Sequence, residues 1–154
     1  MEGHGQKWFA ETTSTQLLDV SRNVTKVKRG FRGGSTVTET VNNLMEANLL
    51  EVFNERDAQR RAVAIESTYA PDVRWTDDEG VVVGREALEA KATALQSQMQ
   101  GLVFTKASPV YQTRGFGYLA WTLGPDGGDP VASGFDVAVV RDDLISELYT
   151  VITT

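Results

Sequence analysis

The sequence predicts an α+β domain in which helices come first and an antiparallel sheet follows. Apolar residues recur at helical spacing over residues 45–70 and again over 84–101. Beyond residue 101 the pattern becomes alternating, and short turn sequences separate successive strands. Strands that follow one another through hairpins pair antiparallel, and a run of helices followed by a run of strands is typical of the α+β class.

Two helices are predicted at the start of the domain. Asn42 or Asn43 is suited to cap the first, because a short polar side chain satisfies the free N–H groups of a first turn. Asp57 is expected to cap the second, which ends at Ala70 because Pro71 disfavours helical geometry in the preceding residue. The inward-facing residues predicted for the two helices are Met45, Leu49, Val52, Phe53, Ala58, Ala62, Ile65 and Tyr69.

The remaining elements follow in order along the chain. Residues 72–83 are predicted to form a strand pair around the acidic turn at 78–80. A third helix follows and ends at Gly101, because glycine tolerates the left-handed conformation that often closes a helix. The four longer strands predicted after it are LVFTKASPVYQT, GFGYLAWTL, VASGFDVAVV and LISELYTVI.

The strand over residues 131–140 has two unlike faces, because successive side chains of a strand point to opposite sides. One face is bulky and apolar, and the other is small-sided with a carboxylate, Asp136, in its middle. Neither face resembles the polar face of a strand exposed to solvent, so both must be covered by other parts of the protein. Small residues around a lone carboxylate predict one wall of a ligand pocket. The bulky residues are Val131, Phe135, Val137 and Val139.

The composition of the 154 residues excludes several kinds of site. Cysteine is absent and histidine occurs once, as His4. Disulfides, thiolate zinc sites and histidine-based catalytic clusters are therefore excluded, and we expect neither a metal nor another cofactor. No apolar run approaches the length of a membrane span and no signal-peptide pattern opens the chain, so a cytoplasmic protein that does not bind membranes is expected.

Residues 1–44 are predicted to be a peripheral or poorly ordered extension of a domain over 45–154, and Met45 is a candidate for the native start. The basic run at 26–34 is either a nucleic-acid contact or a solvated linker. The linker is favoured because the run lacks a phosphate-binding motif. Residues 1–43 carry a charge of +2 and the rest of the chain −8, so we expect no nucleic-acid partner there.

Several local sequences resemble the nuclear transport factor 2-like superfamily, and most closely its SnoaL-like and ketosteroid-isomerase-like branch. The resemblance covers residues 45–151 and is carried by YAPDVRWTD at 69–77, GREAL at 84–88 and Asp136-Val137 before the last hairpin. It implies a cone-shaped, curved antiparallel sheet wrapped around helices, the cystatin-like α+β barrel, with a pocket inside the cone. It also implies a homodimer through the outer face of the sheet. One such scaffold serves many functions.

The resemblance implies roles for two aspartates. In ketosteroid isomerases the aspartate that ends the segment matching YAPDVRWTD is the proton-transferring base, and that position here is Asp77. A second aspartate stays protonated and donates to the developing enolate, and that position here is Asp136. Burial raises the pKa of a carboxyl group, as both roles require. The tyrosine that completes the arrangement has no counterpart on the first helix, where Leu49 and Phe53 are nearest.

The expected function is binding of a small hydrophobic molecule that bears a carbonyl group. Cofactor-independent proton transfer of the isomerase or cyclase type is the expected reaction, and a non-catalytic ligand-binding or dimerisation module is the alternative. In the structural alternative, Asp77 belongs to the acidic turn at 78–80. Asp136 then accepts a hydrogen bond from Arg114, Tyr118 or Tyr149. The predicted ligand-lining aromatic residues, each of which could instead be core, are Tyr69, Trp75, Phe116, Tyr118, Trp121 and Tyr149.

Overall fold

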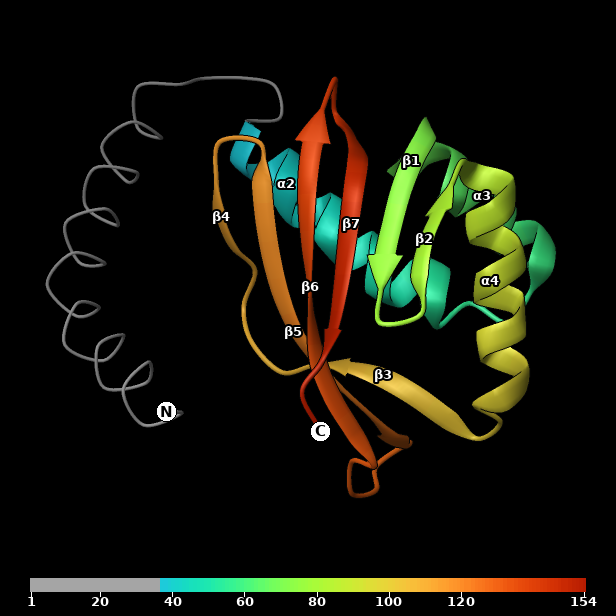
Figure 1. Ribbon diagram of the computed structural model, residues 1–154. Helices are drawn as coiled ribbons and strands as arrows, with labels where there is room; N and C mark the ends of the chain where they lie inside the picture. Colours follow the sequence, from blue (N-terminus) through green and yellow to red (C-terminus); the bar gives the residue numbers. More distant parts are fainter. Residues whose placement is uncertain (1–36) are drawn as a thin grey trace, which may run out of the picture. The chain divides into compact units, whose positions relative to one another are not determined.

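A seven-stranded sheet forms the body of the domain in the computed structural model, which describes residues 37–154 (Figure 1). The strand order is β2-β1-β7-β6-β5-β3, and the short strand β4 also pairs with β5. The strands are β1 Tyr69–Asp77, β2 Gly80–Val83, β3 Leu102–Lys106, β4 Tyr111–Thr113, β5 Phe116–Pro125, β6 Ala132–Arg141 and β7 Leu144–Ile152.

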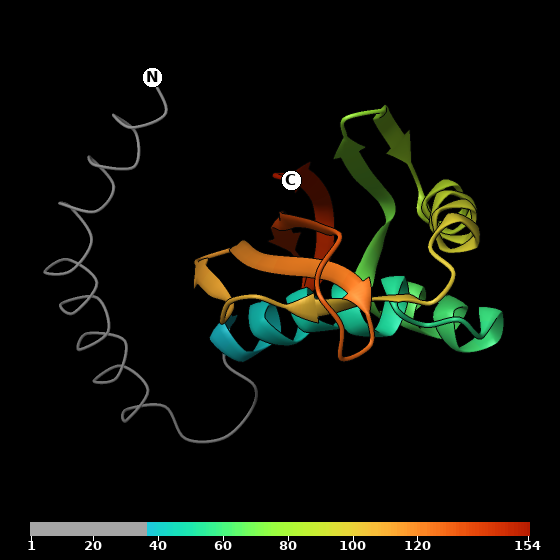
Figure 2. The same ribbon diagram turned by 90° about the horizontal axis from the view of Figure 1, so that it is seen from below.

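Helices cover one face of this sheet. Figure 2 shows α2, η1 and α3 in a row beneath the curved strands, with α4 beyond β1 and β2. The element η1 is a π-helix, a wider helix with hydrogen bonds five residues apart, such as the 3.2 Å bond from the Asn54 N–H to the Leu49 carbonyl. The helices are α2 Val37–Glu46, η1 Ala47–Phe53, α3 Ala58–Thr68 and α4 Arg85–Gln98.

The predicted α+β class and curved sheet are confirmed, with two differences in the sheet. β1 pairs with β7 in parallel, although every other pair is antiparallel. The chain crosses from one strand to the other through helix α4 and the other strands, so a hairpin does not dictate their relative direction. The strand predicted over 102–113 is divided into β3 and β4, with Pro109 in the gap, where its missing N–H cannot join a ladder.

The first helix begins at Val37, ahead of the predicted domain boundary at Met45. Val41 is fully buried and Leu44 is 7% exposed, so this part of α2 belongs to the core of the domain. Gly117 on β5 permits the approach, since a Cβ there would lie 2.8 Å from the Met45 side chain. The interpretations of residues 1–36, including the basic run, lie outside the described residues.

Helix α3 presents a different face to the core from the one predicted. Asp57 caps it as expected, its side chain accepting a 2.9 Å bond from the Arg60 N–H. Ala58 and Ala62 are exposed, and Tyr69 begins β1 instead of ending the helix. Arg61, a charged residue, points inward because its guanidinium group has hydrogen-bond partners there. The buried residues of α3 are Arg61, Ala64, Ile65 and Thr68.

Candidate functional site

The carboxylate of Asp136 lies on the inner face of β6, between the sheet and η1, and the residue is 3% exposed. It accepts three hydrogen bonds from side chains of the described residues. Asn48 Nδ2 donates to Oδ2 at 2.7 Å. Trp121 Nε1 and Thr150 Oγ1 donate to Oδ1 at 3.2 Å and 2.8 Å. A helix and the two strands that flank β6 therefore meet at one carboxylate.

Burial raises the pKa of Asp136 from 3.8 to about 6, since the charged form loses its hydration inside the domain. The three donors act in the opposite direction, with Thr150 first, then Trp121 and Asn48. They favour the charged form but do not offset desolvation. The result is a carboxyl group that exchanges its proton close to neutral pH, which is the property a general base requires.

A second layer of hydrogen bonds holds two of these donors. The Tyr69 hydroxyl donates to Asn48 Oδ1 at 2.5 Å, and both side chains are fully buried. Trp75 Nε1 donates to Thr150 Oγ1 at 3.0 Å. Burial and the charge of Asp136 raise the pKa of the Tyr69 phenol well above its usual value, so the phenol keeps its proton as a donor.

Aromatic rings surround this polar cluster on the inner face. Trp75 and Phe104 each make an edge contact with Phe53, at ring-centre distances of 5.1 and 6.3 Å. Phe104 also meets Trp121 edge-on at 5.1 Å. Gly134 makes room for the indole, because a Cβ there would lie 2.6 Å from the Trp121 ring. The cluster therefore faces an apolar, aromatic interior.

Asp77 lies at the end of β1, separated from β6 by β7. Its Oδ1 accepts the N–H groups of Glu79 and Gly80 at 2.9 and 3.2 Å, which closes the turn between β1 and β2. Its Oδ2 lies 2.5 Å from Lys91 Nζ, and that ammonium group sits 4.7 Å from the centre of the Trp75 ring. Asp77 is thus held in a turn and an ion pair, at the edge of the aromatic interior.

The structure separates the six aromatic residues predicted to line the ligand. Tyr69, Trp75 and Trp121 are buried with Asp136. Phe116 and Tyr149 are each 40% exposed, and Tyr118 alternates with the buried Leu119 on β5. These three lie on the outer face of the sheet and do not line the same site as Asp136.

The hydrogen-bond donors anticipated for Asp136 were wrong. Tyr118 and Tyr149 are on the other face, and the actual donors include Asn48 and Thr150, which sequence reasoning missed. One signal was available for Asn48, a polar residue on the same helical face as Met45, Leu49 and Val52. Thr150 carried no such signal, because only the pairing of β6 with β7 places it opposite Asp136.

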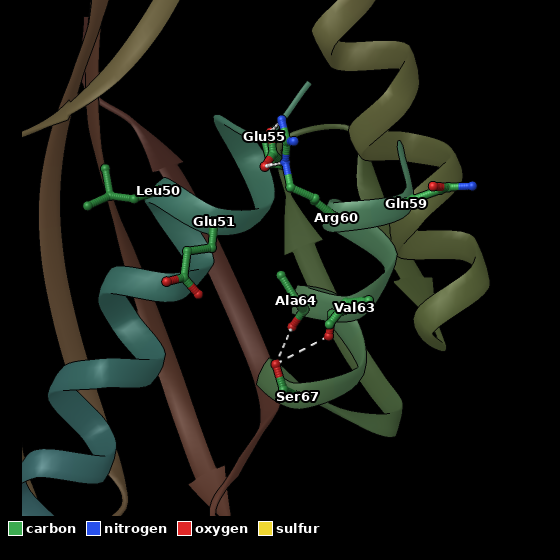
Figure 3. Close-up of a pocket in the computed structure, with 8 residues that line it drawn as sticks. All are labelled: Leu50, Glu51, Glu55, Gln59, Arg60, Val63, Ala64 and Ser67. Atoms are coloured by element: carbon green, nitrogen blue, oxygen red, sulfur yellow. Dashed lines mark hydrogen bonds and ion pairs between the residues drawn. The ribbon is translucent and has the colours of Figure 1, made fainter. Parts of the chain in front are cut away.

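Two surface hollows lie away from this cluster, along η1 and α3. The first, of about 500 Å³, is drawn in Figure 3 and includes Leu50, Glu51 and Val63. The second, of about 440 Å³, shares Leu50, Glu51 and Ser67 with it. Their walls include exposed side chains and none of the groups bonded to Asp136.

Over residues 37–154, no helix is long and apolar enough to span a membrane. Within the same range, acidic and histidine side chains do not gather in groups of three or more that could hold a metal ion.

Comparison with known proteins points to one family. The model of a family described as the SnoaL-like domain matches residues 47–148. A search of curated proteins found no match.

Solved structures share the fold. A candidate isomerase of the SnoaL-like family from Agrobacterium tumefaciens is 22% identical, with a TM-score of 0.69 over 75% of this chain and 98% of that one. A candidate SnoaL-like polyketide cyclase from Jannaschia sp. is 13% identical, with a TM-score of 0.62 over 79% and 91%. A candidate ketosteroid isomerase from Kribbella flavida is 18% identical, with a TM-score of 0.57 over 75% and 79%. At these identities the likeness establishes the fold.

Proposed function

The chain belongs to the family of SnoaL-like domains, and from that premise we propose that it binds a small hydrophobic carbonyl compound on the inner face of its sheet. We propose further that Asp136 transfers a proton at the carbon beside the carbonyl group, without a cofactor. The observation that carries the proposal is the Asp136 carboxylate itself, which is buried, held by three donors and has a pKa raised to about 6.

The hydrogen bonds support a base at Asp136 and do not suit a neutral acid there. All three partners present N–H or O–H groups, which favour an ionised oxygen. In the proposed step, the C–H bond breaks, the proton passes to the Asp136 carboxylate, and the electron pair forms an enolate. Return of the proton to a different carbon gives an isomerase. Attack of the enolate on a second carbonyl forms a carbon–carbon bond and an alkoxide, and transfer of the proton from Asp136 to that alkoxide completes a cyclase reaction.

The aromatic interior suits a hydrophobic ligand but also covers the base. Asp136 is 3% exposed, so a ligand reaches it only after part of the Phe53, Phe104 and Trp121 contact chain moves aside. The Lys91–Asp77 pair lies at the edge of this interior, and its carboxylate also closes the turn between β1 and β2.

The test is exchange of carbon-bound protons with D₂O in a panel of apolar ketones and ketoesters, followed by NMR. The wild type is expected to accelerate exchange at the carbon beside the carbonyl. Asp136→Asn should abolish the acceleration because the amide cannot take up the proton. Asp77→Asn is the matched control, and in this proposal it retains most of the rate. Equal exchange by the wild type and Asp136→Asn would refute catalysis at this residue.

The second candidate function is a non-catalytic ligand-binding module, favoured by the complete hydrogen bonding of the cluster. Every buried side-chain nitrogen and oxygen in the described range has a partner, as in a structural core. A binder retains affinity in both aspartate variants and exchanges no protons, so the same panel, read by ligand-induced chemical-shift changes, separates the two functions.

We also propose that the outer face of the sheet forms a homodimer. Tyr118 contacts the rings of Tyr111 and Phe135 at 6.0 and 5.1 Å, which gives this face a continuous aromatic surface. Val151→Asp is expected to yield a monomer in sedimentation analysis, because it places a charge in that surface. A wild type that sediments as a monomer at high concentration contradicts the dimer. The large exposed residues of this face are Tyr111, Phe116, Tyr149 and Val151.

A further inference from the structure

We propose that Asn48, oriented by Tyr69, is a positioning residue that keeps the Asp136 carboxylate charged and leaves one lone pair of its Oδ2 open. The inference rests on the proposed function only in taking Asp136 as the group that accepts a proton. It assigns a role to two fully buried polar side chains on different elements, Asn48 on η1 and Tyr69 at the start of β1.

The direction of each hydrogen bond follows from the chemistry of the groups. A protonated phenol at 2.5 Å from Asn48 Oδ1 donates to that oxygen. The amide nitrogen then faces Asp136 and donates at 2.7 Å. A flipped amide would place its oxygen against the carboxylate, where two acceptors would meet, and would leave the buried Tyr69 O–H without an acceptor. Tyr69 and the carboxylate together therefore fix which end of Asn48 meets Asp136.

The two oxygens of Asp136 are not equivalent. Oδ1 accepts hydrogen bonds from Trp121 and Thr150. The Thr150 hydroxyl accepts the N–H of Trp75 with a lone pair, and its hydrogen remains to donate to Asp136. Oδ2 receives Asn48 alone in the described part of the chain. A carboxylate oxygen accepts about two hydrogen bonds, so the remaining acceptor position lies on Oδ2, next to the Asn48 amide.

The support behind Asn48 is rigid. The Tyr69 backbone carbonyl accepts bonds of 2.9 and 2.7 Å from Arg85 Nε and Nη2, which ties the start of β1 to the start of α4. Asn48 itself lies in the π-helix, a rare geometry that occurs frequently at functional sites. The side chain is thus held from its backbone and from its amide oxygen.

The experiment is a titration of the Asp136 carboxyl carbon by NMR with ¹³C-labelled aspartate, the signal being assigned through its loss in Asp136→Asn. Asn48→Ala removes a donor to the charged form, so the midpoint is expected to rise by about one pH unit above that of the wild type. Tyr69→Phe removes only the hydroxyl oxygen and is expected to keep the fold. The Asn48 side-chain amide then loses the bond that orients it. Its midpoint is expected to rise by about half as much.

Asn54→Ala is the matched control. Asn54 is another asparagine at the end of the same helix, and its amide bonds to the Phe104 backbone at 2.8 and 2.7 Å without contacting Asp136. It is expected to reduce stability and to leave the Asp136 midpoint unchanged. An unchanged midpoint in Tyr69→Phe and Asn48→Ala overturns the inference, as does an equal rise in Asn54→Ala.

The inference and the proposed function fail separately. A raised midpoint in the two variants, with no proton exchange by the wild type, supports the positioning role and removes the catalytic function. Exchange that depends on Asp136, with an unshifted midpoint in both variants, keeps the function and removes the positioning role.

Discussion

Two buried charges in this domain, Arg61 and Asp136, are each 3% exposed and are satisfied in opposite ways. The Arg61 guanidinium meets an opposite charge, with Nη2 2.8 Å from a carboxylate oxygen of Glu89. It also donates to the Glu55 carbonyl and to the Gln96 side chain, each at 2.8 Å. Among residues 37–154, the Asp136 carboxylate has only neutral donors.

The difference separates a structural charge from a chemically available one. A buried ion pair retains both charges because each stabilises the other, and removal of either partner is costly. Neutral donors compensate a carboxylate only in part, so the pKa of Asp136 rises to about 6 while the group remains hydrogen-bonded. The Arg61 cluster joins α3, α4 and the end of η1, whereas the Asp136 cluster can exchange a proton.

The largest expected effect is on stability, from Arg61→Met. The substitution removes the Arg61 donor from the Glu89 carboxylate, the Gln96 side-chain oxygen and the Glu55 backbone carbonyl. The free energy of unfolding, measured in urea, is expected to fall by about 3 kcal/mol. The neighbouring Arg60, whose side chain is 72% exposed in its pair with Glu55, is the control. If Arg60→Ala destabilises the domain as much as Arg61→Met, the contrast between buried and exposed pairs is wrong.

The next largest effect is the dependence of stability on pH, which comes from Asp136. Asp136 binds its proton more tightly in the folded domain, where its pKa is about 6, than in the unfolded chain, where 3.8 applies. The folded state therefore holds more protons between these values, and stability falls as pH rises through the interval. Relative to Asp136→Asn, the wild type is expected to lose about 2 kcal/mol between pH 4 and 6.5.

Urea unfolding of both proteins at several pH values measures this difference. The comparison with Asp136→Asn removes the contribution of other carboxyl groups, such as Glu46, whose pKa is lowered by its hydrogen bond with Lys106. Those groups stabilise the fold with the opposite pH dependence. A difference that stays constant with pH would mean that Asp136 keeps an ordinary proton affinity, and the contrast with Arg61 would lose its basis.

The smallest expected effect comes from a pair of intermediate burial, Lys91 and Asp77, whose side chains are 20% and 10% exposed. Lys91→Met removes the ion pair and the contact with the Trp75 ring. The free energy of unfolding should fall by about 1 kcal/mol. The Asp136 titration should not move, because Lys91 contacts none of its three donors. A shift of that midpoint would instead show that the ion pair acts on the carboxylate.

Several elements could be predicted because their signals are local. Asp57 caps a helix, and Gly101, at φ 78°, follows one, since each satisfies or permits a terminal backbone geometry. The burial of Asp136 followed from its small and apolar neighbours at alternate positions. The inward face of α3 was not predictable in this way, because Arg61 is buried only by virtue of partners on α4 and at the end of η1.

The sequence by itself determined the order of helices and strands, the α+β class and the presence of one buried carboxylate on β6. These depend on periodicity and on residues adjacent along the chain. The tertiary structure decided which aromatic residues share a face with that carboxylate. It also decided that its hydrogen-bond donors are Asn48, Trp121 and Thr150. A hydrogen bond such as that between Asn48 and Asp136 joins residues 88 positions apart, and only the packing of η1 against the sheet brings them within 2.7 Å.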